Sequence, residues 1–185
     1  MATLVLSVIG DDRAGLVDAL AAPIADHGGN WDRSHLARLA GQFAGIVVVT
    51  LPDERVDSLS GTLEGLTAQG VLDVRVAIAG SSDAPIDASS VIMHLVGQDR
   101  PGIIKEIASA LAARDVSIEE LETSTGSAPM SAEQLFEATA TLRLPATVTT
   151  DELCADLEDI ANELMVDLDV TETAPPRARH NDARG

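Results

Sequence analysis

A short motif bounded by glycines occurs twice in the sequence, 87 residues apart. Its first copy is Gly10-Asp11-Asp12-Arg13-Ala14-Gly15-Leu16, and its second copy is Gly97-Gln98-Asp99-Arg100-Pro101-Gly102-Ile103. An apolar run precedes each copy, and apolar residues at four-residue steps follow it. This is the pattern of a strand that turns into an amphipathic helix. The repetition indicates that the chain is a duplication.

The pattern around the motif also repeats, because apolar runs and helical stripes follow one another in the same order in both halves. The expected strands cover residues 3–9, 31–39, 43–51 and 71–79, then 91–96, 116–124, 134–144 and 165–171; the expected helices cover 16–27, 56–66, 103–114 and 153–164. The order βαββαβ gives an antiparallel four-stranded sheet with both helices on one face. We therefore predict an α+β chain of two ferredoxin-like units.

One insertion accounts for the difference in spacing between the halves. Pro52 and Pro145 each stop a strand, and Phe43 and Phe136 also correspond, both pairs at an offset of 93 residues. This offset exceeds that of the motif by six residues, so the second half carries a six-residue insertion, which we place in a loop near 126–133. Two registers separated by one insertion favour duplication over chance.

Composition divides the chain into domains. Residues 81–89 are rich in Ser, Asp, Ala and Pro without periodicity, and we interpret them as a linker between a first domain, 1–80, and a second, 90–173. Residues 174–185 hold three arginines and no apolar stripe, which indicates a disordered tail. Each predicted sheet has an uncovered face and free edges, so we expect an interface between the copies, where a site could be completed.

Charge and composition exclude several functional classes. The formal net charge of −18 argues against unaided binding to DNA or to an anionic membrane surface, because both need clustered cations. No apolar run approaches the roughly 20 residues of a membrane-spanning helix, and we read no secretion signal. The single cysteine, Cys154, excludes an internal disulfide framework. We expect a soluble, acidic, cytoplasmic protein.

The sequence does not predict catalysis. We find no nucleophile–base pair, Walker loop or dinucleotide fingerprint. The four histidines show no metal-ligand spacing, and Cys154 has no neighbouring basic residue that would lower its pKa. We therefore predict a protein that is not an enzyme and has no cofactor and no metal.

Further stretches match a known family when they are taken together with the two motifs. These stretches are Gly28-Gly29-Asn30-Trp31, residues 37–45, Ile118-Glu119-Glu120-Leu121, Ala128-Pro129-Met130-Ser131 and Leu164-Met165-Val166-Asp167. The duplicated unit with Gly-x-Asp-Arg-x-Gly after its first strand resembles tandem ACT domains, which are regulatory amino-acid-binding modules. It is more similar still to the glycine cleavage system transcriptional repressor group, from about residue 3 to 172.

The resemblance implies a non-catalytic regulator that binds a small amino acid and acts through a partner protein. The implied partner is a DNA-binding activator, which suits a chain too acidic to bind DNA itself. Three positions depart from the family pattern: Ala14 replaces the motif proline, Asp115 replaces a helix-ending glycine, and Ser117 replaces an asparagine. The first half keeps that asparagine as Asn30, at a position that often contacts the ligand in ACT domains.

The predicted ligand-binding residues are the two motifs and the start of the second strand in each half. They are Gly10, Asp11, Asp12, Arg13, Ala14, Gly15, Leu16 and Asn30, then Gly97, Gln98, Asp99, Arg100, Pro101, Gly102, Ile103 and Ser117. A strand-to-helix turn leaves backbone N–H groups unpaired at the positive end of the helix dipole. Such a turn is suited to a carboxylate or a phosphate.

Each of these residues also has an interpretation without a ligand. Asp12 and Asp99 suit a ligand ammonium or an ordinary helix N-cap. Arg13 and Arg100 suit a ligand carboxylate or a salt bridge to the other copy, and Asn30 suits an amino-acid head group or a turn. The motif glycines suit close ligand approach or tight turns and packing.

Two functional hypotheses follow from this sequence. The first is an amino-acid-binding transcriptional regulator of the glycine cleavage system. The second is a ligand-free protein-interaction module that modulates a metabolic enzyme. Either hypothesis allows a homodimer.

Overall fold

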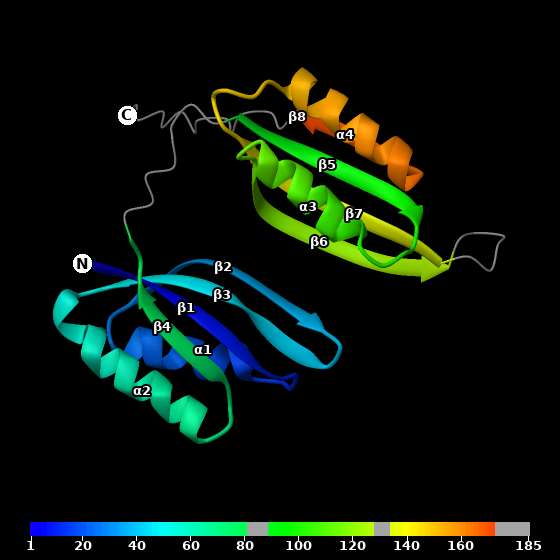
Figure 1. Ribbon diagram of the computed structural model, residues 1–185. Coiled ribbons are helices and arrows are strands. Elements are labelled where there is room, and N and C mark those ends of the chain that lie inside the picture. Colours follow the sequence, from blue (N-terminus) through cyan, green and yellow to red (C-terminus); the bar gives the residue numbers. More distant parts are fainter. Residues whose placement is uncertain (81–88, 128–133, 173–185) are drawn as a thin grey trace, which may run out of the picture. The chain divides into compact units, whose positions relative to one another are not determined.

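The computed structural model describes residues 1–80, 89–127 and 134–172. The chain divides into two units, 1–83 and 84–185, each with its own sheet and pair of helices (Figure 1). The expected linker apart from Ser89, most of the expected insertion loop and the expected tail at 174–185 lie outside the described residues.

The first unit has the order βαββαβ. Its elements are β1 (Ala2–Asp11), α1 (Leu16–Asp26), β2 (Asn30–Leu39), β3 (Gln42–Leu51), the short 3-10 helix η1 (Asp53–Arg55), α2 (Val56–Ala68) and β4 (Asp73–Ile78). The strands form an antiparallel sheet in the order β2-β3-β1-β4. Both helices cover the same face of this sheet (Figure 1).

The second unit repeats this architecture. Its elements are β5 (Ser89–Gln98), α3 (Ile103–Ala113), β6 (Ser117–Ser127), β7 (Gln134–Leu144), α4 (Thr150–Leu164) and β8 (Val166–Glu172). The strand order, β6-β7-β5-β8, is the order of the first sheet with every strand replaced by its counterpart. The predicted α+β fold of two ferredoxin-like units is confirmed.

Buried and exposed side chains alternate along the central strands, and the buried ones define the sheet face that the helices cover. In β1 the side chains of Leu4, Leu6 and Val8 are buried, and successive strand residues point to opposite faces. They pack against Leu16, Leu20 and Ile24 of α1, spaced by four along one helix face. The second unit repeats this core with Val91, Met93 and Leu95 of β5 and with the stripe Ile103, Ile107 and Leu111 of α3. Each such side chain contributes about 1.5–3 kcal/mol by leaving water.

The second strand of each unit carries an irregularity at the same point. Pairing of β2 with β3 shifts register between Trp31 and Arg33, and pairing of β6 with β7 shifts between Ile118 and Glu120. The extra residue at such a bulge interrupts the ladder and redirects a side chain. Asp32 and Glu119 are therefore acidic residues at equivalent bulges of two edge strands.

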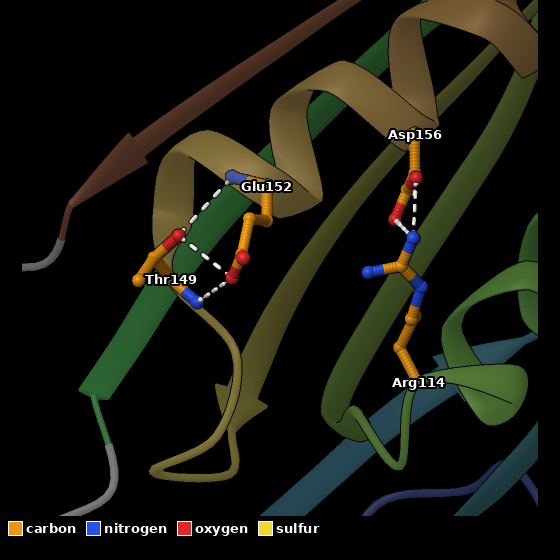
Figure 2. Close-up of polar contacts among 4 residues, drawn as sticks. All are labelled: Arg114, Thr149, Glu152 and Asp156. Carbon is orange, nitrogen blue, oxygen red and sulfur yellow. Dashed lines mark hydrogen bonds and ion pairs between the residues drawn. The ribbon is translucent and has the colours of Figure 1, made fainter.

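A polar contact joins the two helices of each unit and starts from equivalent residues, His27 and Arg114. His27, which follows α1, has its Nε2 3.0 Å from Ser58 Oγ on α2. Arg114, 87 residues later and following α3, donates from Nη2 to Asp156 Oδ1 on α4 at 2.6 Å (Figure 2). The residue after the first helix is equivalent in the two units, but the second unit uses an ion pair, and its partner on α4 lies about one helical turn further along than Ser58 does on α2.

The capping box at the start of α4 predicts a pH-dependent stability. Thr149 Oγ1 accepts from the backbone N–H of Glu152, and Glu152 Oε2 accepts from the N–H of Thr149 at 3.0 Å (Figure 2). The Thr149 hydroxyl also donates to Glu152 Oε2 at 2.9 Å, and the bonds from the Thr149 N–H and hydroxyl lower the pKa of Glu152. A lowered carboxyl pKa stabilises the folded state above the unfolded-state value of about 4.3, and this stabilisation is lost as pH falls through the folded value.

We therefore expect Glu152→Gln to destabilise the second unit at neutral pH, and the difference from wild type to shrink as pH falls below about 4. Urea unfolding between neutral and acidic pH measures this difference. Glu158→Gln, an exposed change on the same helix outside the capping box, is the control. A deficit for Glu152→Gln that stays constant with pH would contradict the role of its charge.

Gly97 offers a second test, because a Cβ added to it would lie 2.3 Å from Val166 Cγ1 on β8. We expect Gly97→Ala to lower the free energy of unfolding by about 1–3 kcal/mol, the usual cost of overpacking. In the double variant Gly97→Ala with Val166→Ala, the free energy of unfolding should fall by less than the sum of the two single decreases, because the shortened Val166 leaves room for the added Cβ. Gly126→Ala, which meets nothing within 4 Å, is the control in urea unfolding. Equal effects at Gly97 and Gly126 would exclude the packing role.

Candidate ligand site at the doubled motif

The motif loop of the first unit lies beside the β2–β3 turn. The N–H of Asp12 donates to Gly41 O at 2.9 Å, so the loop is held against the hairpin where β1 ends. In the second unit the N–H of Asp99 donates to Gln134 O at 2.9 Å in the equivalent way. Both loops therefore lie at the same end of their own sheets.

The motif glycines have two distinct conformational roles. Gly15 and Gly102 are the N-cap residues of α1 and α3, with φ of 91° and 102°, a left-handed conformation that favours glycine. Gly10 and Gly97 instead allow close packing: an added Cβ would lie 3.1 Å from Leu72 Cδ2 in the first case and 2.3 Å from Val166 Cγ1 in the second. The doubled glycine pattern is therefore explained without a ligand.

The N-cap interpretation of Asp12 and Asp99 is wrong. The caps are Gly15 and Gly102, three residues later, and neither helix has a side-chain hydrogen bond at its cap. Asp12 instead pairs with Arg38 of β2 at 3.4 Å. The amides at both helix starts therefore lack the side-chain acceptor that an aspartate N-cap supplies.

Each motif arginine binds a group of its own unit. Arg13 Nη2 lies 3.3 Å from the carbonyl oxygens of Gly70 and Val71, where α2 leads into β4. Arg100 Nη2 forms an ion pair with Glu106 Oε2 on α3 at 3.2 Å. Arg13 therefore links the motif loop to the connection between α2 and β4. Arg100 instead pairs with α3, the helix that follows its own loop.

A groove of about 530 Å³ opens beside the motif loop of the first unit. Its lining includes four predicted residues, Asp12, Arg13, Gly15 and Leu16, and four that sequence reasoning missed, Val17, Asp18, Ala21 and Phe43. Val17 and Ala21 are one helical turn apart, beside the stripe that faces the core. Phe43 pairs with Gly10 across the sheet. The groove thus combines an apolar wall with two carboxylates, one guanidinium and the start of a helix.

Asn30 and Ser117 lie far from the motif of their own unit. Asn30 pairs with Thr50, whereas Gly10 pairs with Phe43, seven residues away on the same strand. At the rise of an extended strand this separation is roughly 23 Å. Ser117 pairs with Arg143 and Gly97 with Phe136, which gives the same separation. Within a unit, the structure does not bring these predicted residues into one site.

The described residues offer little for metal or thiol chemistry. No group of three or more His, Cys, Asp or Glu among them is arranged to hold a metal ion. Burial, and then the neighbouring carboxylates Glu158, Asp151 and Asp169, raise the pKa of the Cys154 thiol, which makes it a poor nucleophile. No helix within the described ranges is long and apolar enough to cross a membrane.

Residues 2–77 match the family profile of the ACT domain. The first unit is an ACT domain. The second unit repeats its element order and strand order, so the chain carries the ACT fold twice. A search of curated proteins finds no match.

Two solved structures are similar to this chain over nearly its whole length. An unknown protein from Galdieria sulphuraria is 28% identical, with a TM-score of 0.83 over 94% of this chain and 99% of its own. A protein provisionally named a glycine cleavage system transcriptional repressor is 18% identical, with a TM-score of 0.70 over 93% of this chain and 97% of its own. At that identity the second likeness establishes the fold alone.

The backbone role of Gly15 gives a prediction that needs no ligand. Gly15→Ala should lower the free energy of unfolding by about 1–2 kcal/mol, because a left-handed alanine is strained. Apart from the two neighbouring residues of the chain, nothing lies within 4 Å of the added Cβ, so crowding does not explain the loss. Gly61→Ala, exposed within α2 and also free of neighbours, should raise it by about 0.5–1 kcal/mol. Urea unfolding of the ligand-free protein checks both signs, and a neutral Gly15→Ala would remove the conformational explanation.

Proposed function

We propose that this chain is a non-catalytic regulatory protein that binds a small amino acid in the groove of its first ACT domain. The observation that carries the proposal is the coincidence of the family match at 2–77 with a groove at the motif loop. An ammonium suits the carboxylates of Asp12 and Asp18, while a carboxylate suits the first amides of α1 and the guanidinium of Arg13. Val17, Ala21 and Phe43 leave an apolar wall for a small side chain.

The regulatory output proposed is contact with another protein in the cytoplasm. A net charge of −18 over 185 residues repels nucleic-acid phosphates, so direct DNA binding is disfavoured. A DNA-binding activator, whose own surface is basic, is an electrostatically suitable partner. Control of the glycine cleavage system as the target rests on the resemblance of the two motifs and their flanking stretches to that repressor group. A homodimer is compatible with this scheme.

A second candidate function is a ligand-free interaction module that modulates a metabolic enzyme. The contacts of the motif favour it, because the four glycines have conformational roles and both arginines have partners in their own units. On this proposal the motif loop only connects β1 to α1, and the groove beside it binds no ligand.

Titration calorimetry with glycine, serine and the branched amino acids separates the two candidates. We expect saturable binding of at least one of them, and Ala21→Leu, which fills the groove, should weaken it by about tenfold or more. Ala108→Leu, at the equivalent position of the second unit, is the matched control and should leave binding unchanged. Circular dichroism of both variants confirms that they fold.

If none of these amino acids gives a heat of binding at millimolar concentration, the proposal that the chain binds a small amino acid is rejected. Where an amino acid does bind, capture of partners from native cell extract with and without it decides the rest. A partner whose retention depends on the amino acid supports the regulator, whereas retention that is the same with and without amino acids supports the ligand-free module.

A further inference from the structure

The helices that the structure describes cover one face of each sheet and leave the other face without a helix (Figure 1). Partners across a ladder point to the same side, so the strand register arranges the side chains of this open face in rows across the sheet. The three central rows of the first unit are Arg33, Val48, Val5 and Ala77; His35, Ile46, Ser7 and Arg75; and Ala37, Ala44, Ile9 and Asp73. Ile9 and Ile46 remain 48% and 50% exposed there. This first-unit face is therefore largely aliphatic on its two central strands and charged on its two outer strands.

The open face of the second unit carries carboxylates at three positions where the first-unit face carries basic side chains. The replacements, taken from the equivalent rows, are Glu120 for Arg33, Glu122 for His35 and Asp169 for Arg75. Glu137 on β7 adds a carboxylate where the first unit has Ala44. One further charged position, Asp73 in the first unit and Asp167 in the second, is acidic in both. This second-unit face is therefore strongly acidic, whereas the first-unit face holds two arginines.

The described residues do not neutralise these charges. Among them, Arg33 and Arg75 form no ion pair, and neither do Glu122 and Asp169. All four side chains are exposed. An arginine binds a carboxylate through paired N–H donors, whereas like charges that face each other repel. The arginines of the first-unit face therefore favour an acidic surface as its partner.

The first-unit face is also hollowed beside each of its arginines. A depression of about 540 Å³ has Arg33, Ile46 and Val48 in its lining. A second depression, of about 400 Å³, has Arg75, Ile9 and again Ile46 in its lining. Each guanidinium therefore lies beside an aliphatic wall, where the methylene groups of an acidic side chain from a partner can pack while its carboxylate pairs with the arginine.

We propose that the first-unit face binds the second-unit face of another copy of this chain, and that the same contact in the opposite direction closes a two-fold dimer. The second copy supplies the acidic surface that Arg33 and Arg75 lack in their own unit. Three rows across four strands cover roughly 400 Å² per face, so the two contacts bury about 800 Å² on each copy, which is the size of a standard stable interface. The amino-acid groove is lined by the motif loop, α1 and Phe43, so this interface goes beyond the function proposed above.

Sedimentation velocity of the full chain at micromolar concentration and physiological salt tests the interface. We expect the wild type to sediment as a dimer of two 19.2 kDa chains. Arg33→Glu with Arg75→Glu places like charges on both sides of the contact and should raise the dimer dissociation constant by about tenfold or more. Glu122→Arg with Asp169→Arg should raise it similarly from the opposite face.

An equimolar mixture of these two double variants should form a dimer again. The introduced glutamates of one chain then meet the introduced arginines of the other, and the two unchanged faces form the wild-type contact. The matched control for the first variant, Arg55→Glu with Lys105→Glu, makes the same change in net charge at exposed positions outside both faces and should remain a dimer.

Circular dichroism confirms that each variant folds. Arg33→Ala with Arg75→Ala, which removes the charges without introducing repulsion, should also weaken the dimer, so the test does not depend on the reversed variants alone. A wild type that stays monomeric, a reversed variant as dimeric as wild type, a control that dissociates as much as the reversed variants, or a mixture that stays monomeric would overturn the proposal.

Discussion

The burial of one face of each sheet is the constraint on which the rest of the structure depends. Aromatic residues make up only 2% of the chain, so the core is built from aliphatic side chains that alternate along the strands and recur by turns on the helices. Once Leu4, Leu6 and Val8 face inward, α1 must cross that face directly after β1. The motif loop is the connection that this crossing requires, and its left-handed glycine sets the direction in which the helix leaves.

The two halves keep their cores and differ in their polar contacts. The link between helices is a histidine–serine contact in one unit and the ion pair of Arg114 with Asp156 in the other. The helix-ending position is Gly28 in one and Asp115 in the other, both with positive φ, at 71° and 55°. Aspartate tolerates that conformation better than most residues, so the turn survives the loss of glycine. Duplication has therefore preserved backbone geometry while surface chemistry has diverged.

The sequence pattern identified the motif loop as the centre of the candidate site. It identified only half of the residues that line the groove beside the loop. Asp12, Arg13, Gly15 and Leu16 are contiguous and repeated, so pattern alone reveals them. The helical turn of α1 brings Val17, Asp18 and Ala21 beside the loop. The β1–β3 register brings Phe43 there. The assignment of Asp12 and Asp99 as caps failed because aspartate is a common cap residue, whereas here the turn continues for three more residues to glycine.

The sequence by itself determined the duplication, the order of elements, the aliphatic core and the acidic charge, because these follow from periodicity and composition, which are local properties of a chain. Only the tertiary structure decided which polar groups meet. It separated Asn30 from the motif by the length of a strand, gave Arg13 the carbonyls of Gly70 and Val71, and set Thr50 and Arg143 at matching places beside two bulge carboxylates. Such contacts join residues far apart in the chain, and their distances depend on strand register and bulge position, which no local pattern encodes.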